Sequence, residues 1–95
     1  MAKRKIMWSN TAIKKLFAIF EADIRKSNSK EYSIDLFKTI SEQIKLLVKH
    51  PLTGTITSDE SVRVLISETI IIYYGLSEDR ISIFTISEFS KHSGK

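Results

Sequence analysis

The stretch LVKHPLTGTITSDESVRVLI, residues 47–66, contains the point where one kind of secondary structure gives way to another. Pro51 lacks a backbone donor and disfavours helical geometry at His50, so a helix that reaches this point ends here. After Gly54 the pattern changes, because residues 62–67 alternate in the manner of a strand. The stretch therefore divides the chain into a helical half and a half made of strands.

Two amphipathic helices are predicted before Pro51. Apolar residues recur at three- and four-residue spacing over residues 12–24 and again over residues 32–48. The polar segment 26–30 separates the two patterns, and Ser9 offers a side-chain oxygen to the free N–H groups at the start of the first helix. Two helices joined by so short a loop lie antiparallel, as a helical hairpin.

Strands are predicted on both sides of this hairpin. Residues 5–8 form a brief strand before it, and residues 62–67, 70–76 and 81–87 form an antiparallel meander after it. The sequence thus predicts an α+β fold of order β-α-α-β-β-β, in which the helical hairpin packs on one face of an antiparallel sheet. The other face of the sheet is left open.

Composition sets limits on what this chain does. Its 95 residues form a single predicted domain, 1–95, with 42% hydrophobic residues and a net charge of +4. Residues 1–30 hold eight basic and two acidic residues, whereas the rest of the chain holds seven basic and nine acidic residues. This basic end suggests attraction to a polyanion or an acidic partner, or lysines on the outer face of a helix. Without cysteine, disulfides, zinc-thiolate sites and cysteine nucleophiles are excluded.

The sequence contains neither a membrane span nor a secretion signal. No apolar run approaches the ~20 residues needed to span a bilayer, and the basic start is not followed by the apolar segment of a signal peptide. We therefore expect a cytoplasmic protein that does not bind a membrane.

Motifs for metal, nucleotide or hydrolase chemistry are not found. His50 and His92 do not share a metal-ligand spacing, no serine stands in a G-x-S-x-G pattern, and the three glycines are isolated. The acidic pairs at 59–60 and 78–79 fall in predicted turns, where solvated carboxylates are common. The prediction is therefore no metal and no cofactor.

Arg63 is the residue that most invites a functional interpretation. If Val62, Val64 and Ile66 pack under the helices, Arg63 points to the open face, where its guanidinium is a bidentate donor for phosphate. The alternative is a structural arginine that pairs with a carboxylate such as Glu88 on a neighbouring strand. The pattern alone leaves both possibilities open.

Taken together, these residues resemble the RelE/ParE toxin superfamily. The resemblance spans about residues 5–88 and agrees in the order and spacing of the elements. The residues that carry it are Trp8-Ser9 followed by Ala12 and Leu16, His50-Pro51-x-x-Gly54, Val62-Arg63-x-Leu65, Ile72 with Tyr73 or Tyr74, and Ile81-x-Ile83.

The resemblance implies a toxin of a bacterial type II toxin–antitoxin module. Such a protein causes growth inhibition, contributes to plasmid stabilization, and is held inactive by a cognate antitoxin protein. It also implies that promoter DNA is bound only through the antitoxin.

Two activities occur in this superfamily. RelE-like members cut messenger RNA on the ribosome without a metal, and for them the resemblance implies Arg63, Lys91 and His92 as catalytic residues. The loop over residues 51–61, however, contains no Lys or Arg, and beyond Ile86 there is no Arg or Tyr. ParE-like members act on DNA gyrase and lack that catalytic set, so the sequence favours a ParE-like toxin.

Two further interpretations remain open. One is an inactive relative that serves only as a binding partner. The other is an unrelated nucleic-acid-binding module built on the basic segment 1–30, which lacks the interleaved aromatic residues that stack on bases.

Overall fold

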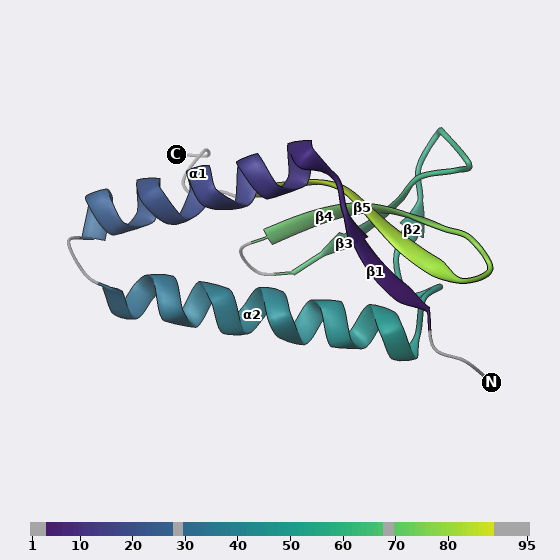
Figure 1. Ribbon diagram of the computed structural model, residues 1–95, viewed down its shortest axis with the longest axis horizontal. Helices are drawn as coiled ribbons and strands as arrows, with labels where there is room; N and C mark the ends of the chain where they lie inside the picture. The colour runs from purple at the N-terminus through teal and green to yellow at the C-terminus, as the bar shows by residue number, and fades with distance from the viewer. Residues whose placement is uncertain (1–3, 28–29, 68–69, 89–95) are drawn as a thin grey trace.

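The computed structural model describes residues 4–27, 30–67 and 70–88. Within these residues, two helices and five strands follow one another (Figure 1). In chain order they are β1 (Lys5–Trp8), α1 (Asn10–Ser27), α2 (Lys30–Lys49), β2 (Thr55–Ile56), β3 (Arg63–Ile66), β4 (Ile70–Leu76) and β5 (Arg80–Glu88). The α+β class and the helical hairpin are therefore confirmed.

The five strands form one mixed sheet in the order β1-β5-β4-β3-β2. Strands β3 to β5 form the predicted antiparallel meander and β2 adds to it antiparallel, but the prediction of an antiparallel sheet is wrong for β1, which joins the edge of β5 in parallel. A parallel pair needs a long crossover between its strands, and here nearly the whole chain supplies it. Strand β2 was not predicted, because two residues are too few to show a period.

Ser9 connects the first strand to the first helix. Its Oγ accepts a hydrogen bond of 3.0 Å from the backbone N–H of Ala12, which is the predicted N-cap contact. The same hydroxyl donates to the backbone oxygen of Phe84 at 2.7 Å, so the start of α1 is fastened to β5. At the other end of the hairpin α2 stops at Lys49, two residues before Pro51, as expected.

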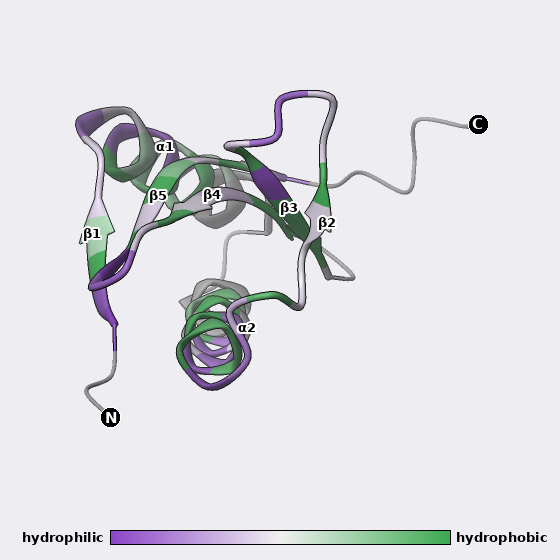
Figure 2. Ribbon diagram, turned by 90° about the vertical axis from the view of Figure 1, so that its right-hand side faces the viewer, coloured by the Kyte–Doolittle hydropathy of each residue, from purple (hydrophilic) through white to green (hydrophobic). Residues whose placement is uncertain are grey.

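The core lies between the helices and the sheet. Figure 2 shows α2 beneath the sheet, whose strands arch over it, and α1 packs against β5 and α2. The buried apolar side chains come from both helices and from three strands; they are Ala12, Ile19, Leu36, Ile40, Leu47, Leu65, Ile70, Ile72, Tyr74, Ile81, Ile83 and Ile86. Neither described helix is long and apolar enough to cross a membrane.

The orientation of β3 differs from the sequence-based prediction. Leu65 is buried opposite Ile72, whereas the side chain of Ile66 is 61% exposed. Because side chains alternate along a strand, Val64 lies with Ile66 on the open face. The condition that residues 62, 64 and 66 pack under the helices is therefore not met by Val64 and Ile66. Apolar residues occur at consecutive positions in this strand, so its pattern did not fix which face is inside.

Candidate functional site

Arg63 lies on the face of the sheet that packs on the helices. It is paired directly with Tyr74 in the β3–β4 ladder, and side chains that stand opposite one another share a face. Tyr74 has no exposed surface and belongs to the core. Of the two possibilities that the sequence left open, the one in which Arg63 points to the open face is therefore excluded, because Arg63 shares the inner face with Leu65.

The side chains of Arg63 and Tyr74 both form hydrogen bonds with the loop that follows α2. Nη1 of Arg63 donates to the backbone oxygen of Gly54 at 2.7 Å and to that of Leu52 at 3.4 Å. The Tyr74 hydroxyl accepts from the backbone N–H of Gly54 at 2.8 Å and donates to the backbone oxygen of Pro51 at 2.8 Å. We call Arg63, Tyr74 and residues 51–54 the loop clamp.

Gly54 is required by the loop clamp for a steric reason. A Cβ atom at this position would lie 2.7 Å from Cε1 and 2.9 Å from Cζ of the Tyr74 ring. The backbone N–H and C=O of this residue are also both used, the first by Tyr74 and the second by Arg63. The spacing from Pro51 to Gly54 therefore reflects close packing of the loop on β3 and β4.

Arg63 thus has a structural role, but not the one proposed from the sequence. Its partners are backbone carbonyls, and the carboxylate of Glu88 is not beside it. Glu88 pairs with Ile70 at one end of the β4–β5 ladder, four positions along β4 from Tyr74. No local sequence pattern indicates that a loop, rather than a neighbouring strand, supplies the acceptors.

The open face of the sheet is formed by apolar and hydroxyl side chains. Its members are Met7 from β1, Val64 and Ile66 from β3, Ile71 and Tyr73 from β4, and Ser82, Phe84, Thr85 and Ser87 from β5. Within the described strands, the charged side chains on this face are Lys5 and Arg80, which stand opposite each other at its β1–β5 end. Its centre therefore carries no cation.

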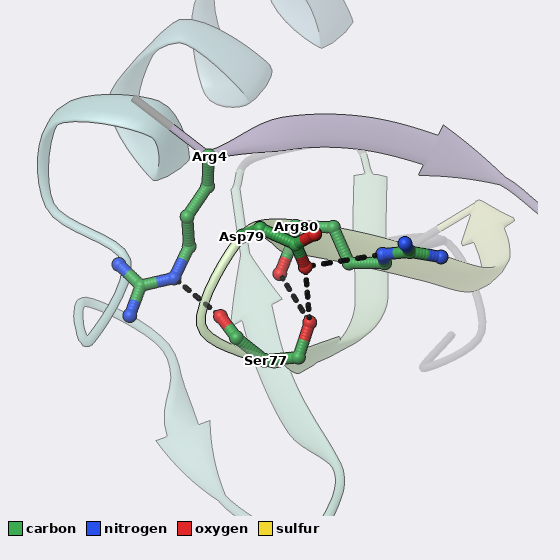
Figure 3. A network of polar contacts seen from close by, with 4 residues as sticks. All are labelled: Arg4, Ser77, Asp79 and Arg80. Atoms are coloured by element: carbon green, nitrogen blue, oxygen red, sulfur yellow. Dashed lines mark hydrogen bonds and ion pairs between the residues drawn. The ribbon is translucent and has the colours of Figure 1, made fainter. Parts of the chain in front are cut away.

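A polar network surrounds the turn between β4 and β5 at that end (Figure 3). Arg4 donates through Nε to the backbone oxygen of Ser77 at 2.7 Å, and Nε of Arg80 lies 3.3 Å from Oδ1 of Asp79. The hydrogen bond from Arg80, and then its positive charge, lower the pKa of Asp79. Asp79 and Arg80 are exposed and Arg4 is half-buried, so the network links the residue before β1 to the turn and forms no buried site.

The acidic residues flagged in the sequence behave as turn residues. Oδ1 of Asp59 accepts hydrogen bonds from the hydroxyl of Ser61 at 2.7 Å and from its backbone N–H at 3.0 Å. These two bonds lower the pKa of the Asp59 carboxyl, which is fully exposed. Within the described residues no three His, Asp or Glu side chains are grouped so that they could hold a metal ion.

The remaining candidate residues are divided between a helix end and the chain terminus. Lys49 and His50 are exposed at the C-terminal end of α2, where a cation is favoured by the helix dipole. Lys91 and His92 lie outside the described residues. The structure therefore locates Arg63 alone of the three candidate catalytic residues.

The protein resembles known proteins in its structure and not detectably in its sequence. No protein-family model matches the sequence, and no curated protein matches it either. Among solved structures, a chain of the chromosomal ParDE toxin–antitoxin system from P. aeruginosa superposes with a TM-score of 0.77. The two are 22% identical, and the match covers 93% of this chain and 98% of that one.

A second solved structure has a similar fold. A chain of the E. coli DinJ-YafQ toxin–antitoxin complex matches with a TM-score of 0.59 and 14% identity, over 92% of this chain and 93% of that one. Both matches run almost from end to end, so they concern the whole arrangement of hairpin and sheet. The chain therefore has the fold of the RelE/ParE toxins, as its sequence pattern suggested.

Proposed function

We propose that this protein is the toxin of a bacterial type II toxin–antitoxin module, that it is neutralised by a cognate antitoxin, and that it acts on DNA gyrase in the manner of ParE. The fold supports the first part, because both structural matches come from toxin–antitoxin systems. The match to the ParDE system has the higher TM-score of the two, 0.77 against 0.59, which favours the ParE-like assignment.

The loop clamp is the observation that carries the choice of target. A nuclease that cleaves RNA needs cations at the scissile phosphate, where they stabilise the charge that develops during attack. Here the guanidinium of Arg63 donates to the carbonyls of residues 52 and 54 instead. Among the described strand residues, the centre of the open face carries no cation.

The alternative function is a RelE-like, ribosome-dependent and metal-independent mRNA endoribonuclease. Its support is the position of Arg63 in β3, the first long strand after the helical hairpin, which matches the catalytic arginine that the resemblance implies. In this alternative Lys91 and His92 complete the catalytic set. The ribosome and its messenger RNA are then the target in place of gyrase.

The same proposal covers the cellular setting. The protein acts in the cytoplasm, causes growth inhibition when its antitoxin is missing, and contributes to plasmid stabilization where the module is carried on a plasmid. Promoter DNA is contacted only through the antitoxin.

Two assays on the purified full chain separate the gyrase from the ribosome. In the first, gyrase supercoils relaxed plasmid in the presence of increasing protein, and we expect inhibition. In the second, ribosomes translate a defined messenger and cleavage is mapped by primer extension, and we expect no new cleavage. Full supercoiling at high protein concentration, together with cleavage at codons in the ribosomal decoding site, would overturn the gyrase assignment and support the alternative.

A further inference from the structure

The open face of the sheet carries large apolar side chains that remain exposed. Ile66 on β3 is 61% exposed, Met7 on β1 is 46% exposed and Phe84 on β5 is 40% exposed. Ile71 and Tyr73 on β4 continue the surface between β3 and β5, and Ile71 stands directly opposite Ile66. A contiguous apolar surface of this kind marks an interaction site.

One corner of this face has a small positive charge. Lys5 and Arg80 stand opposite each other in the β1–β5 ladder, and Arg4 joins them through its hydrogen bond to the turn between β4 and β5. The same turn holds Glu78 and Asp79, and Asp79 lies 3.3 Å from Arg80. Three cations against two carboxylates leave a net charge of +1. We call these five residues the basic corner.

The neighbouring corner of the same face is acidic. The loop over residues 57–62 joins β2 to β3 at the end of the sheet where the β4–β5 turn also lies, but along the opposite edge. The loop leans over the open face, because the backbone oxygen of Ser61 lies 3.0 Å from where a Cβ atom of Gly75 would stand. Asp59 and Glu60 are exposed, and the loop contains no cation. We call this loop the acidic corner.

The twist of the sheet makes the open face complementary in shape to a second copy of itself. In a twisted sheet one pair of diagonal corners rises and the other pair falls. Figure 2 shows the connection between β2 and β3 standing above the sheet, and the start of β1 lying lower at the other edge. Two twisted sheets pack face to face with their strands about 30° apart, so that the high corner of each lies over the low corner of the other.

We propose that the open face binds the open face of a second copy of this chain, across a two-fold axis that runs along β4. This axis reverses the strand order, so β4 lies over its own copy, β5 over β3, and β1 over β2. The same surface is then used by both subunits. The basic corner of each subunit meets the acidic corner of the other, and this contact occurs twice. The inference goes beyond the proposed function and does not depend on the target.

Charge selects a second copy in this orientation. One face supplies both members of the charge pair, and a two-fold axis along the strands brings them together. An axis that crosses the strands keeps the two corners apart. Opposite potentials favour an interface and like charges oppose it. Within the described strands the centre of the face carries no charged side chain, so its burial leaves no charge unpaired.

The size of the open face predicts a reversible dimer. Five strands at a spacing of ~4.8 Å make the sheet about 19 Å wide, and the seven residues of β4 make it about 23 Å long. Two faces of this size bury roughly 900 Å², which is the range of weak and transient complexes. Monomer and dimer should therefore exchange, and protein concentration should set their ratio.

An exchange of charge between the two corners tests the orientation. Sedimentation equilibrium of the full chain over a wide range of concentration should show a monomer–dimer equilibrium. Lys5→Glu and Glu60→Lys should each weaken the dimer at least about fivefold, because each places like charges opposite one another at two symmetric contacts. The double variant Lys5→Glu/Glu60→Lys restores opposite charges and should bring the dissociation constant back to within about twofold of the parent protein.

Apolar substitutions test the surface. Met7→Ser/Ile66→Ser removes two exposed side chains from the open face and should weaken the dimer at least about tenfold. The matched control is Phe17→Ser/Phe37→Ser, which removes two exposed side chains from the helices and should leave the dissociation constant unchanged. Circular dichroism confirms that each variant is folded.

Cross-linking tests the position of the axis. The chain has no cysteine, so a single introduced thiol is unique. Tyr73 lies at the middle of β4 on the open face, where the axis passes. A bismaleimide with a reach of about 10 Å, the spacing of packed sheets, should therefore join two copies of the Tyr73→Cys variant. Lys15→Cys, an exposed position on α1, is the control and should give no cross-linked dimer.

Three results would overturn the proposal. The first is a monomer at every concentration. The second is a dimer that Phe17→Ser/Phe37→Ser weakens and Met7→Ser/Ile66→Ser does not, because the helices then form the interface. The third is a double charge variant that dimerises no more tightly than either single variant, because the two corners then do not meet. None of these measurements involves gyrase or the ribosome, so failure here is distinguishable from failure of the proposed function.

Discussion

The hydroxyl oxygen of Tyr74 lies 2.8 Å from the backbone nitrogen of Gly54 and accepts a hydrogen bond from it, although the two residues are 20 positions apart. The same oxygen donates to the backbone oxygen of Pro51. One buried side chain in the second-longest strand therefore satisfies both a donor and an acceptor of the loop that ends α2. This contact sets where the helical hairpin joins the sheet.

Replacement of Gly54 by alanine tests the close approach of loop and ring. The new methyl group would lie 2.7 Å from Cε1 of Tyr74, well inside van der Waals contact. The ring cannot move away easily, because it is fully buried and held by two hydrogen bonds. We expect Gly54→Ala to lower the free energy of unfolding by about 1 to 3 kcal/mol, measured by urea denaturation.

Gly75→Ala is the comparison for that variant. A Cβ atom at Gly75 would lie 2.7 Å from Cζ of Phe84 and 3.0 Å from the backbone oxygen of Ser61. Phe84, however, is 40% exposed and can swing outward. The loss of stability should therefore be smaller than at Gly54, and an equal or larger loss would contradict the view that the loop clamp is the more rigid contact.

Removing the Tyr74 hydroxyl separates its hydrogen bonds from its packing. Tyr74→Phe keeps the ring but leaves the N–H of Gly54 and the C=O of Pro51 without this partner. An unsatisfied buried polar group costs about 1 to 3 kcal/mol, so we expect a destabilisation in that range. Tyr73→Phe is the matched control on the opposite face of the same strand, and it should change the free energy of unfolding by less than about 0.5 kcal/mol.

These contacts show what the sequence could and could not predict. The N-cap at Ser9, the helical hairpin and the stop before Pro51 depend on neighbouring residues, so local rules found them. Strand alternation also requires the adjacent Tyr73 and Tyr74 to take opposite faces, and Tyr74 is the buried one.

The orientation of Arg63 could not be predicted in the same way. Residues 62, 64, 65 and 66 are all apolar, so both faces of β3 looked equally suited to the core. Which face of β3 is buried is decided by Tyr74, which supplies a ring, and by the loop at residues 52–54, which supplies carbonyl oxygens to Arg63. Both are distant from β3 in sequence. Strand β2 and the parallel pairing of β1 depend on such distant contacts too.

The turn between β4 and β5 leads to a prediction about acid. Arg80 lowers the pKa of Asp79 below its usual value of 3.8, so the folded protein favours the charged carboxylate. The stabilisation is present above the pKa of the unfolded chain and is lost as the pH falls through the lower pKa of the folded state. Asp79→Asn should therefore flatten the fall in stability below about pH 4.

The response to salt distinguishes the contribution of Asp79 to stability from that of Asp59. The pKa of Asp59 is lowered by hydrogen bonds from Ser61 and not by a charged neighbour. At 1 M salt the Debye length is about 3 Å, so the charge interaction of Asp79 with Arg80 is screened. In stability measurements against pH, we expect salt to reduce the effect of Asp79→Asn and to leave that of Asp59→Asn largely unchanged; equal responses would refute this assignment of causes.

Arg63→Ala tests the structural role and the choice of target together. The variant removes the hydrogen bonds to the carbonyls of Gly54 and Leu52, and bonds from a charged group contribute about 1.5 to 3 kcal/mol. We expect a loss of stability near that range, against less than about 0.5 kcal/mol for the exposed control Lys15→Ala.

The activity of Arg63→Ala is then measured at low temperature, where circular dichroism shows that the variant is folded. If Arg63 only anchors the loop through its hydrogen bonds, the folded variant should inhibit gyrase to within a few-fold of the inhibition by the parent protein. If Arg63 instead stabilises charge on a scissile phosphate, cleavage of messenger RNA on the ribosome should fall ~10²–10³-fold even in the folded variant. The second result, with supercoiling unaffected by the parent protein, would replace the gyrase assignment with the nuclease.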